Sequence, residues 1–178
     1  MSGRVLVAGI GNIFLGDDAF GSEVAQRLSA DEWPDGVRVS DFGIRGLDLA
    51  FALLDGYETV VLVDAMPRGN EPGAICVLEA EAPEPGSVAV DAHAMDPMRV
   101  LAAARSMGAC WNRLLVVGCE PAPGAADPDG PGGLGMSPAV QQAVGEAAQI
   151  VRRLVCGLIS ENSARSSEPR SSGQSSSA

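Results

Sequence analysis

Acidic residues and a single histidine stand at points where buried strands of this chain should end. Asp17 and Asp18 follow an apolar run, Asp64 ends the run TVVLVD, and His93 precedes a helix that should begin near Asp96. Ligands of open α/β sheets bind beyond the carboxyl ends of the strands, so these side chains come first. Two carboxylates and a neutral imidazole suit a borderline divalent metal such as zinc or nickel. Three such ligands would leave positions open for water or substrate groups.

Each of these residues also has an ordinary structural interpretation. Asp17 suits a helix N-cap, and Asp18 suits the first turn of a helix, where an acid is favourable. Asp64 lies shortly before Met66-Pro67 and suits a turn, while His93 between alanines suits an exposed loop. The residues alone therefore support a candidate metal site and nothing more specific.

Other catalytic motifs are incomplete. The segment GIGNIFLG has Phe14 where a dinucleotide fingerprint needs glycine, and Asp17 where a P-loop needs lysine. There is no G-x-S-x-G elbow. Cys119 at a strand end is the cysteine best placed to pair with His93 as a nucleophile, and a buried structural thiol is the alternative.

These side chains need a scaffold, and the apolar pattern predicts one of alternating strands and helices. Strand-like runs occupy residues 4–10, 37–42, 59–65, 75–79 and 113–119, and two of them are almost continuously apolar, as in strands covered on both faces. Helical spacing of apolar residues appears at Phe20, Val24 and Leu28, at Leu47, Ala50, Phe51 and Leu54, and at Val100, Leu101 and Ala104. Asp96-Pro97 and Ser137-Pro138 each resemble an N-cap followed by a first-turn proline, the second opening a helix over residues 138–158.

This alternation predicts an α/β fold, a three-layer α/β/α sandwich around a mostly parallel sheet. The runs 59–65 and 75–79 are joined by a connection too short for a helix, so we expect a hairpin that adds one antiparallel strand. Residues 121–135, rich in proline, glycine and aspartate, suit either a substrate loop or an inert insertion.

Length and composition favour one folded domain over residues 1–160, followed by a serine-rich disordered tail over residues 161–178. The formal net charge of -11, without any lysine, excludes the basic patch that binds nucleic acid or anionic membrane. No run approaches a membrane span, and no signal architecture opens the chain, so we expect a cytoplasmic protein. The four cysteines form no C-x-x-C pair and should be free thiols.

Four blocks of the sequence, in order, resemble the hydrogenase maturation endopeptidases. They are GIGNIFLGDDAFGSEVAQRL, TVVLVDAMPRG, the lone histidine in DAHAMDP, and VVGCEP, and the similarity spans roughly residues 5–158. The first block is the most specific, because it combines a glycine turn, two acids and a further glycine, Gly21. The resemblance implies a phosphorylase/hydrolase-like fold for a protease domain that removes the C-terminal extension of a nickel-iron hydrogenase large-subunit precursor.

The resemblance also implies roles for individual residues. Metal binding and catalysis would belong to Asp18, Asp64 and His93, and substrate contact to Asp41, Gly43 and Asp17. Ile44 stands where the family segment D-x-G-T-x-G has threonine, so the hydrogen bond of that hydroxyl is absent here. The nickel would arrive with the precursor and would act as Lewis acid, water activator or recognition handle.

Two rival functions remain at this point. One is a zinc-dependent peptidase or amidohydrolase of the same fold, which would hold its zinc tightly. The other is a chaperone that binds the immature large subunit without cutting it. We expect no nucleic-acid or membrane partner, and we take a monomer as the working state.

Overall fold

The computed structural model describes residues 3–85, 96–125 and 135–167. Its elements follow the predicted alternation closely, with strands that begin or end within one residue of their predicted limits. They are β1 (Val5–Ile10), the 3-10 helix η1 (Gly16–Ala19), α1 (Phe20–Ser29), β2 (Val37–Gly43), α2 (Gly46–Leu53), β3 (Thr59–Ala65), β4 (Ile75–Ala80), α3 (Pro97–Ser106), β5 (Arg113–Cys119) and α4 (Pro138–Ser167).

The strands form one sheet in the order β2-β1-β3-β5-β4. All neighbouring pairs are parallel except β4 and β5, which are antiparallel. The predicted antiparallel strand is therefore confirmed, but the predicted hairpin between β3 and β4 is wrong, because β5 lies between them. The connection over residues 66–74 is longer than a tight hairpin turn, and strands lie only about 4.8 Å apart, so it can cross one intervening strand.

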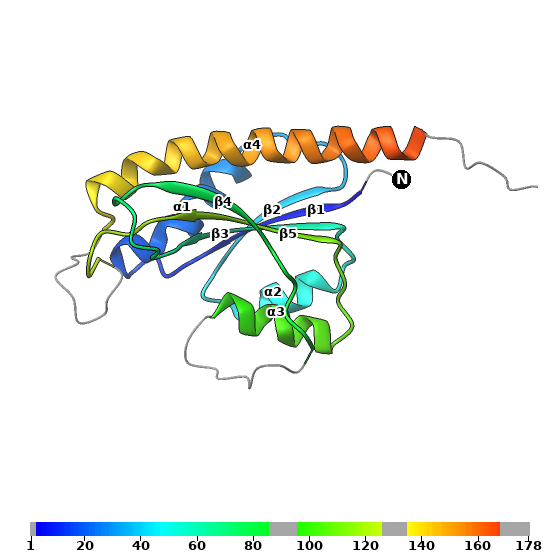
Figure 1. The fold of residues 1–178 in the computed structure, drawn as a ribbon, viewed down its shortest axis with the longest axis horizontal. Coiled ribbons are helices and arrows are strands. Elements are labelled where there is room, and N and C mark those ends of the chain that lie inside the picture. The colour runs from blue at the N-terminus through cyan, green and yellow to red at the C-terminus, as the bar shows by residue number, and fades with distance from the viewer. Residues whose placement is uncertain (1–2, 86–95, 126–134, 168–178) are drawn as a thin grey trace, which may run out of the picture.

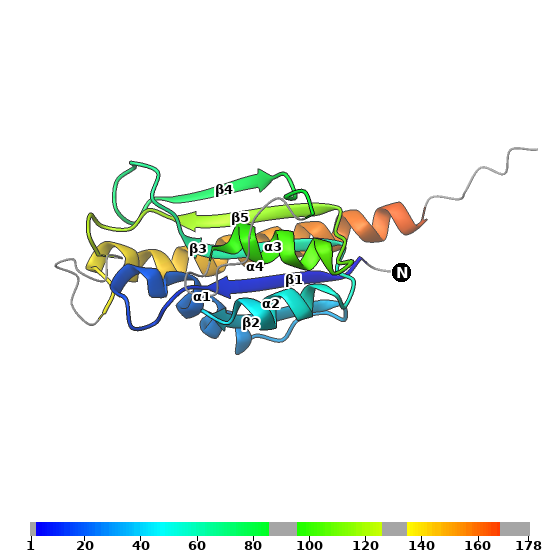
Figure 2. The same ribbon diagram turned by 90° about the horizontal axis from the view of Figure 1, so that it is seen from below.

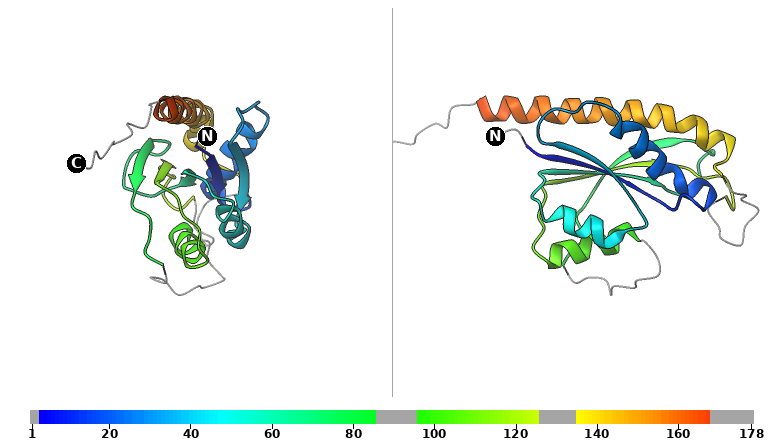
Figure 3. Two further views of the ribbon diagram at one scale, coloured as in Figure 1. Left: turned by 90° about the vertical axis from the view of Figure 1, so that its right-hand side faces the viewer. Right: turned by 180° about the vertical axis from the view of Figure 1, so that it is seen from behind.

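Helices cover both faces of the sheet, as the sequence predicts. Figure 1 shows α1 and α4 above the sheet with α2 and α3 below it, and the left view of Figure 3 shows the three layers end on. In β1, Val5 and Val7 pack with α1 and α4, whereas Leu6 and Ala8 pack with α2 and α3. Alternate side chains of one strand thus enter two cores, which explains why the strand sequences are continuously apolar.

The apolar pattern of α2 gave the wrong buried face. Three of the four predicted residues, Leu47, Phe51 and Leu54, are exposed, while Leu49 and Leu53 are buried against the sheet. Figure 2, seen from below, shows α2 lying along the sheet beside α3. Because this helix is apolar on nearly all sides, spacing alone did not distinguish the buried face from the exposed one.

The last helix is longer than predicted. We expected it to end at Leu158, but α4 continues to Ser167, into the segment predicted as a disordered tail. Residues 159–167 contain neither proline nor glycine, and the hydroxyls of Ser160 and Ser163 donate to carbonyls one turn back, at 2.9 Å each. The next helix-breaking residue is Pro169, and residues 168–178 lie outside the described part of the chain. Among the described helices, none has the length and hydropathy to cross a bilayer.

Candidate active site

The carboxyl ends of the parallel strands meet at one rim of the sheet. There β1 leads through a short loop into η1, β3 ends at Asp64 and Ala65, and β5 is followed by Glu120. In the sheet register Gly9 of β1 lies beside Val63, and Asp64 lies beside Gly118 of β5. Acidic residues from separate parts of the sequence therefore gather at this edge.

Asp18 reaches the rim because two glycines let the backbones come unusually close. A Cβ atom on Gly11 would lie 1.8 Å from the carbonyl oxygen of Asp18, and one on Gly21 would lie 2.0 Å from that of Val63. Gly11 also has a positive φ of 140°, a conformation that other residues rarely adopt. The Asp18 carboxylate is then held by the backbone N–H of Asn12, which donates at 2.8 Å.

The negative charge of Asp18 affects the protonation of Asp64. Burial, followed by the negative charge of Asp18, raises the pKa of Asp64 from 3.8 to about 7, and a hydrogen bond from the Ala65 backbone opposes the shift. A carboxyl with this pKa exchanges a proton near neutral pH, as a general acid or base must. The same pair of acids would also be stabilised by a divalent cation, because a cation offsets the repulsion between them.

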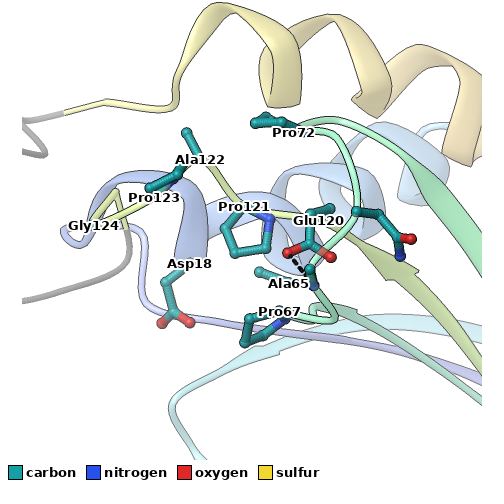
Figure 4. A pocket seen from close by; sticks show the side chains of 11 residues that line it. Asp18, Ala65, Pro67, Pro72, Glu120, Pro121, Ala122, Pro123 and Gly124 are labelled. Atoms are coloured by element: carbon teal, nitrogen blue, oxygen red, sulfur yellow. Dashed lines mark hydrogen bonds between the residues drawn. The ribbon is translucent and has the colours of Figure 1, made fainter.

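A pocket of about 580 Å³ opens beside Asp18. Asp18, Ala65 and Glu120 contribute to its wall, and the proline-rich turns around Pro67 and Pro121 complete it (Figure 4). The pocket lies between the loop after β3 and the segment after β5, so a peptide there would lie directly over the strand ends.

Glu120 is a site residue to which the sequence analysis gave no role. Its carboxylate accepts hydrogen bonds from the backbone N–H groups of Arg68, at 2.7 Å, and Gly69, at 3.1 Å. Burial alone would raise the pKa of Glu120, but the backbone donors of Arg68, Asn70 and Gly69 bring it below its ordinary value. Glu120 thus fixes the loop that forms one wall of the pocket. The sequence feature that could have identified Glu120 is its position in the block VVGCEP, directly after a predicted strand.

Asp17 lies in the interior of the protein. Its side chain is fully buried and accepts hydrogen bonds from the backbone N–H of Ala122, the backbone N–H of Ser137 and the hydroxyl of Ser137, at 2.8, 2.6 and 2.9 Å. Its predicted contact with substrate stays a prediction, and in this structure the carboxylate is occupied by these three donors. The residue ties η1 to both flanks of the segment between β5 and α4.

Asp41 and Gly43 brace the same rim from its outer strand. The Asp41 carboxylate accepts from the Gly43 backbone N–H and from the Gln26 amide, each at 2.9 Å. The Gly43 carbonyl in turn accepts from the Gly11 N–H at 3.1 Å. Asp41 lines a second groove of about 480 Å³ and not the pocket beside Asp18, so its contact with substrate stays a prediction.

His93, the third predicted metal ligand, lies outside the described residues. Within the part of the chain that the structure describes, there is no group of three histidine, cysteine, aspartate or glutamate side chains able to hold a metal. Cys119, the alternative nucleophile, is buried, and burial, followed by the charge of Asp17, raises its pKa to about 12. A thiol that stays protonated at neutral pH is a poor nucleophile, which argues against a cysteine–histidine pair.

Comparison with known proteins gives a consistent result. The model of the hydrogenase maturation protease family matches residues 22–154. The chain is 36% identical over 121 residues to hydrogenase expression/formation protein HupD of Rhizobium leguminosarum bv. viciae, covering 66% of this chain and 59% of that protein. It is 29% identical over 120 residues to hydrogenase 2 maturation protease of Escherichia coli, covering 66% and 73% of the two chains.

The fold has the same relatives. The structure of the hydrogenase maturating endopeptidase HybD from Escherichia coli aligns with a TM-score of 0.66 and 28% identity, over 83% of this chain and 89% of that one. The matched part of the chain corresponds to 57–62% of the length of three similar HupD proteins. The family match begins at Ser22, directly after the last glycine of the first block, and extends through most of the folded domain.

Proposed function

Because this chain belongs to the hydrogenase maturation protease family, we propose that it is an endopeptidase that removes the C-terminal extension of a nickel-loaded hydrogenase large-subunit precursor. The observation that carries the proposal is the placement of Asp18 and Asp64 together at the strand ends, beside an open pocket. The relatives named for hydrogenase maturation and expression support the choice of substrate.

The two carboxylates suit a divalent ion chemically, since oxygen donors of like charge at one rim favour a cation between them. We assign Asp18, Asp64 and His93 as the residues that would hold the nickel carried by the precursor, with zinc as the alternative metal. A bound ion of this kind would supply Lewis acidity toward the scissile carbonyl.

The chain's own residues would perform three tasks. Glu120 keeps the Arg68–Gly69 backbone in place, so the pocket wall is already formed before a peptide enters. Asn12 orients Asp18 through its backbone N–H. Before an ion binds, Asp64 is suited to exchange a proton near neutral pH, given its place at the end of a buried strand.

We place this activity in the cytoplasm, on a monomeric enzyme, with the hydrogenase large-subunit precursor as partner and neither nucleic acid nor membrane involved. The acidic composition supports the expected absence of a nucleic-acid or membrane partner, since it provides no cationic surface for phosphates.

The decisive experiment measures the precursor by intact mass after incubation with the protein. We expect loss of a C-terminal peptide from the nickel-loaded precursor and none from the nickel-free precursor. Asp18→Asn and Asp64→Asn should each reduce cleavage at least about 100-fold, as loss of a metal ligand or of a general acid or base does. Asp35→Asn, an exposed aspartate outside the rim, is the matched control and should cleave normally.

Full processing by both site variants would contradict the residue assignment. Cleavage of the nickel-free precursor at the same rate would remove the metal dependence. Tightly bound stoichiometric zinc in the purified protein would favour the zinc-hydrolase alternative, and binding of the precursor without a mass change would favour a chaperone.

A further inference from the structure

Large apolar side chains are exposed in one region next to the candidate active site. They lie in the β1–η1 loop, in the β2–α2 connection and on the outer side of α2, and we call them the apolar docking face. Its residues are Ile13 (50% exposed), Phe14 (75%), Ile44 (60%), Leu47 (69%), Phe51 (58%) and Leu54 (41%). Monomeric proteins rarely expose adjacent apolar residues of this size without a partner.

The two halves of this face are physically joined. The Gly11 N–H before the first loop donates to the Gly43 carbonyl before the second, at 3.1 Å. From there Leu47, Phe51 and Leu54 follow at helical spacing along α2, on the side opposite its buried residues. This hydrogen bond places the starts of both loops at the same rim, and α2 extends from the second loop.

The part of the face nearest the site is held in place. The Asn12 side chain accepts from the Phe14 N–H at 3.0 Å, and the Asn12 carbonyl accepts from the Leu15 N–H at 3.0 Å. The Asn12 N–H itself donates to the Asp18 carboxylate. Phe14 thus belongs to the same short, hydrogen-bonded loop that orients Asp18, and binding there orders little additional chain.

Charge indicates which kind of partner fits. The groove beside α2 contains Asp41, Asp48 and Asp55 against Arg38 and Arg45. The two arginines are paired with Asp55, at 3.3 Å, and with Asp48, at 3.7 Å. The edge of the docking face is therefore net acidic, on a chain whose formal charge is -11. A second copy of this chain would place one acidic edge against another. A protein with an apolar patch and a basic border would instead complement the docking face.

We propose that the apolar docking face binds the folded body of the large-subunit precursor, through an apolar patch on the precursor bordered by arginine or lysine. This inference rests on the proposed function. Docking of the body at this face would place the precursor's C-terminal segment at the adjacent rim, in reach of Asp18. Recognition of the body would then be separate from recognition of the cleaved peptide.

The test uses the full chain with Leu47→Ser and Phe51→Ser combined, and Ile44→Ser as a second variant outside the helix. Met107→Ser combined with Val77→Ser is the matched control, because both side chains are comparably exposed but lie outside the docking face. We expect KM for the nickel-loaded precursor and the Kd for its binding to rise about tenfold or more in both docking variants, with kcat changed less than about threefold. The control should match the wild type.

The outcomes separate this inference from the proposed function. If the wild type does not cut the precursor, the proposed function fails. If the wild type cuts and both docking variants keep wild-type KM and Kd, this inference is overturned while the proposed function stands. Sedimentation analysis gives a further check, since a wild-type dimer that the docking variants convert to monomer would identify a second copy as the occupant and overturn the inference.

Discussion

The Asp64→Asn substitution should make the metal-free protein more stable at pH 8 while abolishing its activity. Burial and the neighbouring charge of Asp18 raise the pKa of Asp64 from 3.8 to about 7, so the folded state holds this proton more tightly than the unfolded state. At about 1.4 kcal/mol for each pH unit between these values, keeping Asp64 charged in the folded protein costs about 4 kcal/mol. Asparagine removes the charge and still accepts the hydrogen bond from the Ala65 backbone.

The sign of the pH dependence follows from the same two pKa values. Below pH 3.8 the carboxyl is protonated in both folded and unfolded chains, so the substitution should change stability little. As the pH rises from 3.8 to 7, the wild type loses the stability that the bound proton gives, and above pH 7 the loss is complete. The advantage of the variant should therefore grow over this range and then remain constant.

Thermal unfolding in the presence of EDTA, from pH 4 to pH 8.5, measures this effect. For a chain of this size about 4 kcal/mol corresponds to roughly 8–16 °C in Tm, so even half of the calculated effect is measurable. Asp35→Asn is the control and should show no such trend. If Asp64→Asn unfolded at or below the wild-type temperature at pH 8, the close pairing of Asp64 with Asp18 would be wrong.

Three further predictions concern the scaffold of the site. Asp17→Asn should lower the free energy of unfolding by about 2 kcal/mol, because one of the buried donors to this carboxylate loses its acceptor. Urea titration measures this change, and an unchanged urea midpoint would contradict the buried hydrogen-bond network. Gly21→Ala should cost about 3 kcal/mol or more by the same measurement, since the added Cβ would meet backbone at 2.0 Å, and wild-type stability would refute that close approach. At pH 8 iodoacetamide should label the exposed Cys110 and Cys156 of the folded protein but not the buried Cys119, as counted by mass spectrometry; fast labelling of Cys119 would reopen the thiol mechanism.

The strands and the strand-end acids were predictable because their signals are local. A continuous apolar run such as Thr59–Ala65 has few alternatives to a strand covered on both faces, and the acid at its end must then lie at the rim. Asp96 likewise caps α3 as predicted, accepting from the Met98 N–H at 2.9 Å. The same reasoning brought Asp18 and Asp64 to one edge of the sheet.

The features that were missed depend on contacts between distant parts of the chain. Nothing local shows that β5 separates β3 from β4, or that Glu120 reaches back about fifty residues to bind the Arg68 backbone. Ser137 precedes the first helical proline as predicted, but its hydroxyl donates to Asp17, 120 residues earlier. Spacing within one segment carries no information about such partners, so the interior role of Asp17 required the structure.

The Asp17 carboxylate also has a consequence for chain entropy. It holds Ala122 and Ser137 at once, so the segment between them begins and ends at a single buried side chain. For a loop with fixed ends, the entropy of closure grows only with the logarithm of its length, and doubling the number of residues costs about 0.6 kcal/mol. The number of residues between Ala122 and Ser137 can therefore change at little cost to folding, while the buried carboxylate keeps both ends of the segment in place.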